Sequence, residues 1–91
     1  KLTCSSIFEA SKNDGAKDLD NGSCPSGYHK AQLFIRPHNF IGMGGDYHWY
    51  RQDANGEWSD KQGVGAIRFR GKDPLPPIDY PEKCGTICLP N

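Results

Sequence analysis

The chain has little with which to build a large hydrophobic core. Only 35% of its 91 residues are hydrophobic, and its apolar runs, such as Leu33-Phe34-Ile35, are short. Because a membrane-spanning helix needs about 20 consecutive apolar residues, runs of this length exclude one. A chain of this size forms one small domain that buries only about 60–65% of the surface of its unfolded state. Eleven glycines and seven prolines predict many turns.

The chain also lacks an excess of charge of either sign. Eleven basic residues balance eleven acidic ones. No electrostatic argument therefore favours nucleic acid or an anionic membrane as a partner. No signal peptide opens the sequence, and Lys1 in place of methionine indicates a processed N-terminus.

Four cysteines are present, namely Cys4, Cys24, Cys84 and Cys88. An even number in a short chain predicts two disulfides and an oxidising compartment, with each bridge contributing about 2–4 kcal/mol. Zinc is the alternative, since Cys84 and Cys88 have the spacing of a ligand pair, but Cys4 and Cys24 form no second pair. Three connectivities are open. We prefer those in which Cys4 and Cys24 each cross to Cys84 or Cys88 and tie both chain ends to the core.

Asn21-Gly22-Ser23 has the form of an N-glycosylation acceptor. Together with the predicted disulfides, it indicates a secreted glycoprotein in a eukaryotic source. We therefore expect an extracellular location.

The pattern of apolar residues predicts a disulfide-stabilised α+β domain over residues 1–91. One short N-terminal helix packs on a mainly antiparallel sheet of four to five strands. Ser5 or Ser6 is expected to cap the helix and Gly15 to end it. Strands are predicted over residues 29–36, 46–52, the segment after Asn55-Gly56, 64–70 and 84–90. Residues 72–83 are expected to be an irregular, partly polyproline-like loop.

The turn at Asn55-Gly56 decides which side chains share a face of the sheet. A two-residue loop places Arg51 opposite Asp60. His48 and Asp60 then lie on opposite faces, and no site between them is available.

Residues 53–56 also fit a type I turn that ends in a glycine bulge. This three-residue loop pairs Tyr50 with Asp60 and His48 with Gln62. His48 and Asp60 then share a face as diagonal neighbours about 7–8 Å apart at the Cα level. We predict the bulged register, with its glycine at positive φ.

Four segments of the chain resemble one family of secreted and extracellular proteins. "DYHWYRQDANGEWSDKQG" is similar to a signature of the form "DYHWYRQDxxGxWSHKPG", and "CPSGYHKAQLFI" resembles the preceding strand, "CPxGYYKVALFI". "SSIFEASKNDGAK" is similar to the helix before that strand and "YPEKCGTIC" to a closing "YTxFCGYFC". The family resembles the C-terminal, His-bearing half of papain-fold cysteine peptidases of the NlpC or CHAP type.

The resemblance implies that His48 is a general base and that Asp60, twelve residues later, orients it. Relatives usually carry His at the position of Asp60. They also carry Lys-Pro-Gly where this chain has Lys-Gln-Gly, at residues 61–63. The resemblance further implies a partly exposed His48 at the sheet edge, beside an apolar surface that serves as a dimer or partner interface.

The nucleophile of such an enzyme lies in an upstream segment that has no counterpart here. We therefore expect the isolated chain to be inactive and to act with a second chain or as a homodimer. Cys4 is the alternative nucleophile, because a helix N-terminus lowers the pKa of a thiol. A free Cys4 would leave an odd number of cysteines for disulfides.

A second hypothesis is an extracellular binding or defence module without catalysis. Tyr47, Trp49, Tyr50 and Trp58 are its candidate residues for a glycan, peptide or protein ligand. The simpler interpretation of Trp49 and Trp58 is that they fill the core, where aliphatic residues are scarce.

No metal or other cofactor is predicted. His29, His38 and His48 have no known ligand spacing. "DLDNG" and "DANGE" lack the glycine position and terminal glutamate of a calcium loop, so they are interpreted as turns.

Overall fold

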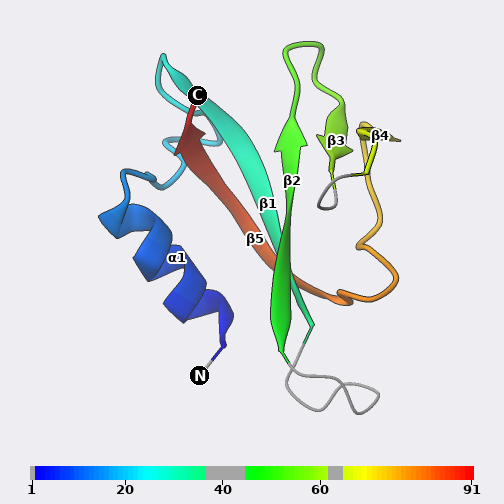
Figure 1. Cartoon of the computed structure of the whole chain (residues 1–91). Coiled ribbons are helices and arrows are strands. Elements are labelled where there is room, and N and C mark those ends of the chain that lie inside the picture. Colours follow the sequence, from blue (N-terminus) through cyan, green and yellow to red (C-terminus); the bar gives the residue numbers. More distant parts are fainter. Residues whose placement is uncertain (1, 37–44, 62–64) are drawn as a thin grey trace.

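A computed structural model describes residues 2–36, 45–61 and 65–91. One helix and one five-stranded sheet make up the fold, which confirms the α+β class (Figure 1). The elements are α1 (Cys4–Asn13), β1 (Tyr28–Arg36), β2 (Asp46–Gln52), β3 (Trp58–Asp60), β4 (Arg68–Gly71) and β5 (Glu82–Pro90).

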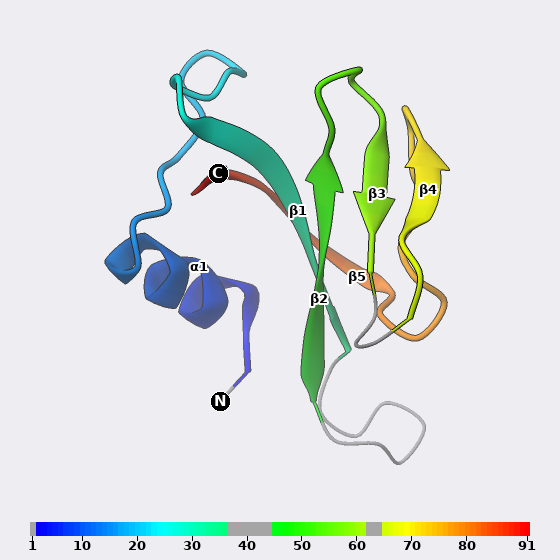
Figure 2. The same cartoon turned by 45° about the horizontal axis from the view of Figure 1, so that its top comes forward.

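The strands lie in the order β4-β3-β2-β1-β5, and every neighbouring pair is antiparallel (Figure 2). The long strands β1, β2 and β5 form one half of the sheet, and the short strands β3 and β4 extend it. The last strand starts at Glu82, so the irregular segment is shorter than predicted. Among the described residues, no helix combines the length and apolar character needed to cross a bilayer.

The helix begins earlier than expected because Thr3, not Ser5 or Ser6, is its N-cap. The Thr3 side chain accepts a hydrogen bond from the Ser6 amide, and the Ser6 hydroxyl accepts one from the Thr3 amide, each at 3.0 Å. This reciprocal pair is a capping box. At the other end, Gly15 takes a φ of +107°, a conformation that other residues rarely adopt.

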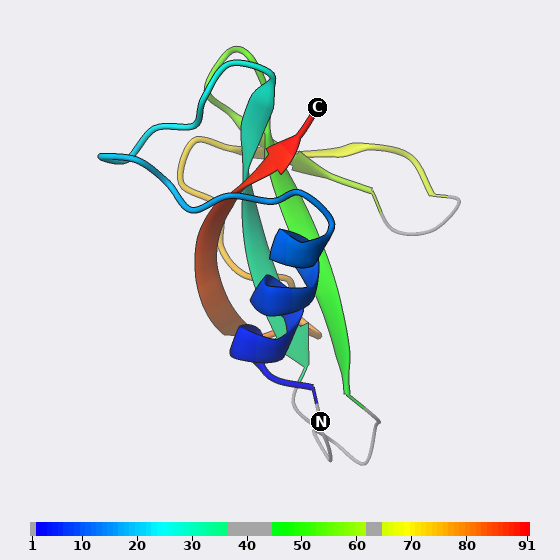
Figure 3. The same cartoon turned by 90° about the vertical axis from the view of Figure 1, so that its left-hand side faces the viewer.

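α1 covers one face of β1 and β5 (Figure 3). Leu33 and Ile35 of β1 are buried beneath it, and the ring of Phe8 lies 6.4 Å from that of Trp49. Because side chains alternate along a strand, this α1 face carries the odd-numbered residues of β1 and β2.

The opposite face of the sheet carries a second core of Phe34, Tyr50 and Trp58, with Tyr80 packed against it. The hydroxyl of Tyr50 donates to the carbonyl of Leu75, at 2.9 Å. The segment between β4 and β5 therefore covers this face. Because both faces are covered, β1 buries consecutive residues instead of alternate ones.

Two disulfides join the ends of the chain to the sheet. Cys4 bonds to Cys84 and Cys24 to Cys88, which confirms the predicted crossing and leaves no free thiol. The first bridge holds the start of α1 against β5. The second holds the segment after α1, where Lys17 also pairs with Cys88 through two backbone hydrogen bonds.

Candidate functional site

The β2–β3 hairpin has the bulged register. Arg51 lies opposite Ser59, and the same register places Tyr50 opposite Asp60. The Gly56 amide donates to the carbonyl of Asp53 at 2.9 Å, and Gly56 has a φ of +86°. The prediction of a three-residue loop is confirmed. The predicted partner of His48, Gln62, lies outside the described residues.

This register brings His48 and Asp60 together. Nε2 of His48 lies 2.7 Å from Oδ2 of Asp60. A carboxylate only accepts hydrogen bonds, so Nε2 carries the proton of this bond. Nδ1 has no hydrogen-bond partner among the described residues. The predicted pairing of these two side chains is thus present in the structure.

Asp60 has two further partners from β4. Arg70 donates from Nε to Oδ1 at 2.6 Å and from Nη2 to Oδ2 at 3.3 Å, and Arg68 donates to Oδ2 at 3.3 Å. The Asp60 side chain is 0% exposed. Its burial alone would raise the pKa of the carboxyl, but hydrogen bonds from Arg70 and His48 and the charges of both arginines lower that pKa below its ordinary value.

Tyr80 packs over the other side of His48, with the ring centroids 5.5 Å apart. Its hydroxyl donates to Oδ2 of Asp46 at 2.8 Å, and Arg36 lies 3.8 Å from the same carboxylate. Burial and this hydrogen bond raise the pKa of Tyr80. Burial opposes ionisation of Asp46, but hydrogen bonds from Tyr80 and the Tyr47 amide lower its pKa.

The family resemblance implied that His48 lies at the edge of the sheet, and this expectation is wrong. β2 is the central strand, and the His48 side chain is only 11% exposed. It is enclosed by Tyr80 and by Tyr50, whose ring meets it edge-on at 5.9 Å. Among the described residues, the large apolar side chains that are most exposed lie around β4 and the segment after it, and Tyr47 is the exposed one on β2.

Arg68, Arg70 and Tyr80 were not predicted as partners of the His48–Asp60 pair. The alternation of Arg68 and Arg70 around Phe69 was the available signal, because it places both cations on one face of a strand. Nothing in the sequence indicates that Tyr80 returns to β2.

Cys4 is not available as a nucleophile, because it is bonded to Cys84. All four cysteines lie within the described residues, and all four form disulfides. Without a thiolate the chain in this state has no cysteine-based chemistry.

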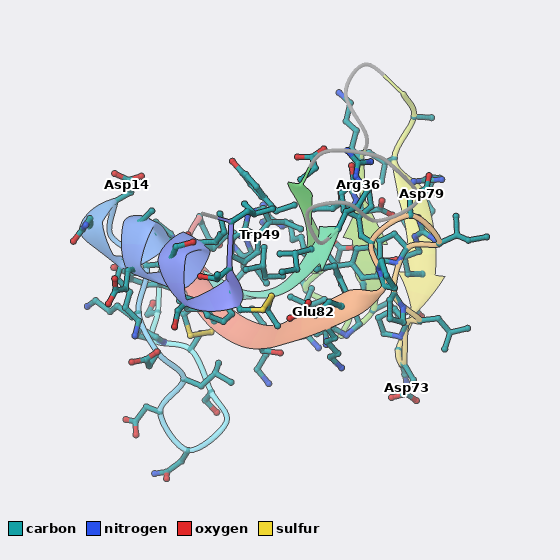
Figure 4. All side chains as sticks on the ribbon, turned by 90° about the horizontal axis from the view of Figure 1, so that it is seen from below. Asp14, Arg36, Trp49, Asp73, Asp79 and Glu82 are labelled. Atoms are coloured by element: carbon teal, nitrogen blue, oxygen red, sulfur yellow. A yellow bond between two sulfur atoms is a disulfide. The ribbon has the colours of Figure 1, made fainter. Side chains whose placement is uncertain are left out.

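The four aromatic residues considered for binding divide into two groups. Tyr50 and Trp58 are buried in the core, so their side chains are not on a surface. Tyr47 is 47% exposed, and Trp49 is partly buried beside α1 (Figure 4).

Exposed apolar side chains concentrate on one short stretch of the chain. Ile67, Phe69, Leu75 and Ile78 are 59%, 77%, 81% and 91% exposed. These four residues are called the β4 surface below. Phe69, Leu75 and Ile78 line one cavity of about 590 Å³ with Arg68, Arg70, Pro76 and Pro77. Asp73 and Asp79 mark the same segment in Figure 4.

Within the described residues, no three His, Cys, Asp or Glu side chains are arranged to hold a metal ion. His29 and His48 lie on different strands, and His38 is outside the described residues. Asn21 is exposed, at a φ of +51°, in a tight turn closed by Asp20 and Ser23.

Comparison with models of protein families, with curated proteins and with solved structures gives no match.

Proposed function

We propose that this chain is an extracellular recognition module that binds an extended segment of a partner protein on the β4 surface. The observation that carries the proposal is the concentration of exposed apolar side chains at Ile67, Phe69, Leu75 and Ile78. Large exposed apolar patches are uncommon on soluble monomers and mark interaction sites.

The position of β4 supports an extended ligand. β4 is an outer strand of the sheet, and an outer strand offers unpaired amides and carbonyls to an added strand. Phe69 points to the α1 face, while Arg68 and Arg70 point to the face of Asp60. A second copy paired about Phe69 would place Arg68 opposite Arg70 of that copy, and like charges in such pairs are destabilising. A different polypeptide is the better partner.

The two disulfides fit an extracellular protein. Modification of Asn21 with a glycan belongs to the same proposal, because Asn21 is exposed and distant in sequence from the β4 surface. Expression through a eukaryotic secretory pathway should give a mass that falls after enzymatic removal of N-linked glycans. An Asn21→Gln variant should show no such fall, and an unmodified wild-type protein would remove this part of the proposal.

A peptide library displayed on phage provides a test that needs no known partner. Selection on the wild-type protein should enrich apolar sequences that bind it at micromolar concentration. Phe69→Lys or Ile78→Lys should weaken binding at least tenfold, since each places a charge in an apolar contact. Ser26→Lys, in an exposed turn, is the matched control and should bind normally. Enriched peptides that bind all three variants equally, or no enrichment, would contradict the proposal.

A second candidate function rests on the His48–Asp60 hydrogen bond. Asp60 orients the imidazole through Nε2, and Nδ1 makes no hydrogen bond to any described residue. A histidine held in this way can serve as a general base if a partner chain supplies a thiol. This is the split hydrolase that the family resemblance implies.

Purification from the native source tests the second candidate. It predicts a co-purifying chain with a reactive cysteine, and an amide-hydrolysing activity that His48→Gln lowers by at least a hundredfold. A protein that purifies alone and gives no hydrolysis would remove this candidate and leave the recognition module unaffected.

A further inference from the structure

A separate cavity of about 480 Å³ lies on the α1 face of the sheet. The registers of the strands place most of its lining side chains on this one face, where α1 packs on β1 and β5 and its Phe8 ring reaches Trp49 of β2. Its size falls within the range of small-ligand sites. The lining residues whose side chains share this face are His29, Ala31, Trp49, Arg51, Asp53, Ser59, Lys61, Ile67 and Leu89.

Apolar side chains form the floor of this cavity. Trp49 stands at its centre on β2, with Ala31 and Leu89 on one side and Ile67 on the other. Ile67 lies two residues before Phe69, whose side chain points to the same face of the sheet. An extended ligand that follows this face from Phe69 past Ile67 would reach Trp49.

Two cations lie at the rim. Arg51 and Lys61 are both exposed, and neither makes an ion pair with any described residue. The other arginines of the neighbouring strands, Arg36, Arg68 and Arg70, all have carboxylate partners. Two unpaired cations beside an apolar floor are complementary to an anion on an apolar body.

We infer that this cavity binds the free carboxyl end of a peptide whose last side chain is apolar. The carboxylate would pair with Arg51 and Lys61, and the last side chain would lie against Trp49. Asp53 and Ser59 offer acceptors for the peptide amides, which a fatty acid does not have. This inference rests on the proposed function, because it names the end of the chain that the β4 surface binds.

Two capped peptides provide the test. Acetyl-Ala-Ser-Ala-Leu with a free carboxyl group is compared with the same peptide as its C-terminal amide, by calorimetry and by Trp emission. The acid should bind about tenfold more tightly than the amide, since a charge-assisted hydrogen bond is lost in the amide. Binding of the acid should change the emission of Trp49, which lines the cavity, whereas Trp58 is buried on the opposite face.

Charge variants locate the contact. Arg51→Gln and Lys61→Gln should each weaken binding of the acid several-fold and leave binding of the amide unchanged. Lys83→Gln, an exposed cation on β5, is the matched control and should have no effect. Equal affinities for acid and amide, no effect of the two variants, or equally tight binding of decanoate in place of the peptide would overturn the inference.

The experiments can show that the carboxylate site is wrong while the β4 surface is right, and the reverse. Ile78 is not a lining residue of this cavity. Displayed peptides that depend on Ile78 but carry no free carboxyl end would support the β4 surface while overturning the carboxylate site. Acid-selective binding that depends on Arg51 but not on Phe69 or Ile78 would support the site and overturn the β4 surface.

Discussion

The imidazole of His48 and the carboxylate of Asp60 are hydrogen-bonded across the β2–β3 hairpin, with Nε2 2.7 Å from Oδ2. Arg68 and Arg70 bind the same carboxylate from β4. Three neighbouring strands thus meet at one buried anion. These contacts join the three strands whether or not His48 acts as a base.

Replacement of Asp60 should strongly destabilise the domain. Asp60→Ala leaves two guanidinium groups and an imidazole without their common partner, and removal of one member of a buried ion pair costs about 3 kcal/mol or more. Asp18→Ala is the control, because it removes an exposed ion pair with Lys12 and should cost less than about 1 kcal/mol. Urea unfolding measures both. Equal losses would show that Asp60 contributes no more than a surface charge.

Acid should destabilise the protein through the same carboxylate. The folded-state pKa values of Asp60 and Asp46 are lowered from an ordinary 3.8. Lowered pKa values contribute stability that is fully present above the unfolded-state pKa and is lost as the pH falls through the folded-state values. The free energy of unfolding should therefore decline from about pH 4 downward. In the Asp60→Asn variant the free energy of unfolding should fall less steeply with decreasing pH. A slope identical to that of the wild type would show that Asp60 does not cause the loss of stability in acid.

Both disulfides should be complete in the native protein. Alkylation without reduction should add no mass, and digestion should yield a Cys4–Cys84 peptide and a Cys24–Cys88 peptide. Because the second bridge closes a long loop, with a sequence separation of 64, Cys24→Ala with Cys88→Ala should cost about 4 kcal/mol. One alkyl group on Cys4 in the native state would revive its role as a nucleophile.

The bulged turn can be tested at Gly56. Its φ is +86° and a Cβ there would meet no atom within 4 Å, so the cost of a side chain is backbone strain alone. Gly56→Ala should destabilise the protein by about 1 kcal/mol, and Gly56→Asn by less, because asparagine tolerates this conformation. Thermal unfolding compares the two variants. Two variants as stable as the wild type would contradict the positive φ.

The parts of the fold that the sequence predicted are those decided by local chemistry. The turn at residues 53–56 fixes its own register, and the register decides which side chains meet across β2 and β3. The helix was predicted in the right place, but its first residue was missed because Thr3 competes with Ser5 and Ser6 as a cap.

The parts that the sequence did not predict depend on contacts between distant segments. Tyr80 reaches His48 from the segment between β4 and β5, and no periodicity indicates where that segment returns. The exposure of Phe69 and Ile78 could not be predicted either, because the sequence alone does not say which apolar side chains become buried against another segment. The edge position of His48, which the family resemblance implied, was wrong because β2 pairs with both β1 and β3.

The central claim is that the β4 surface is where this chain binds its partner. The most direct measurement maps the backbone amide shifts of the isotope-labelled protein as a library-selected peptide is added. The account predicts that the largest shifts fall within residues 67–78, with smaller ones at Trp49 and Arg51. Shifts confined to α1 or to the cavity around Tyr28 and Lys30 would contradict it.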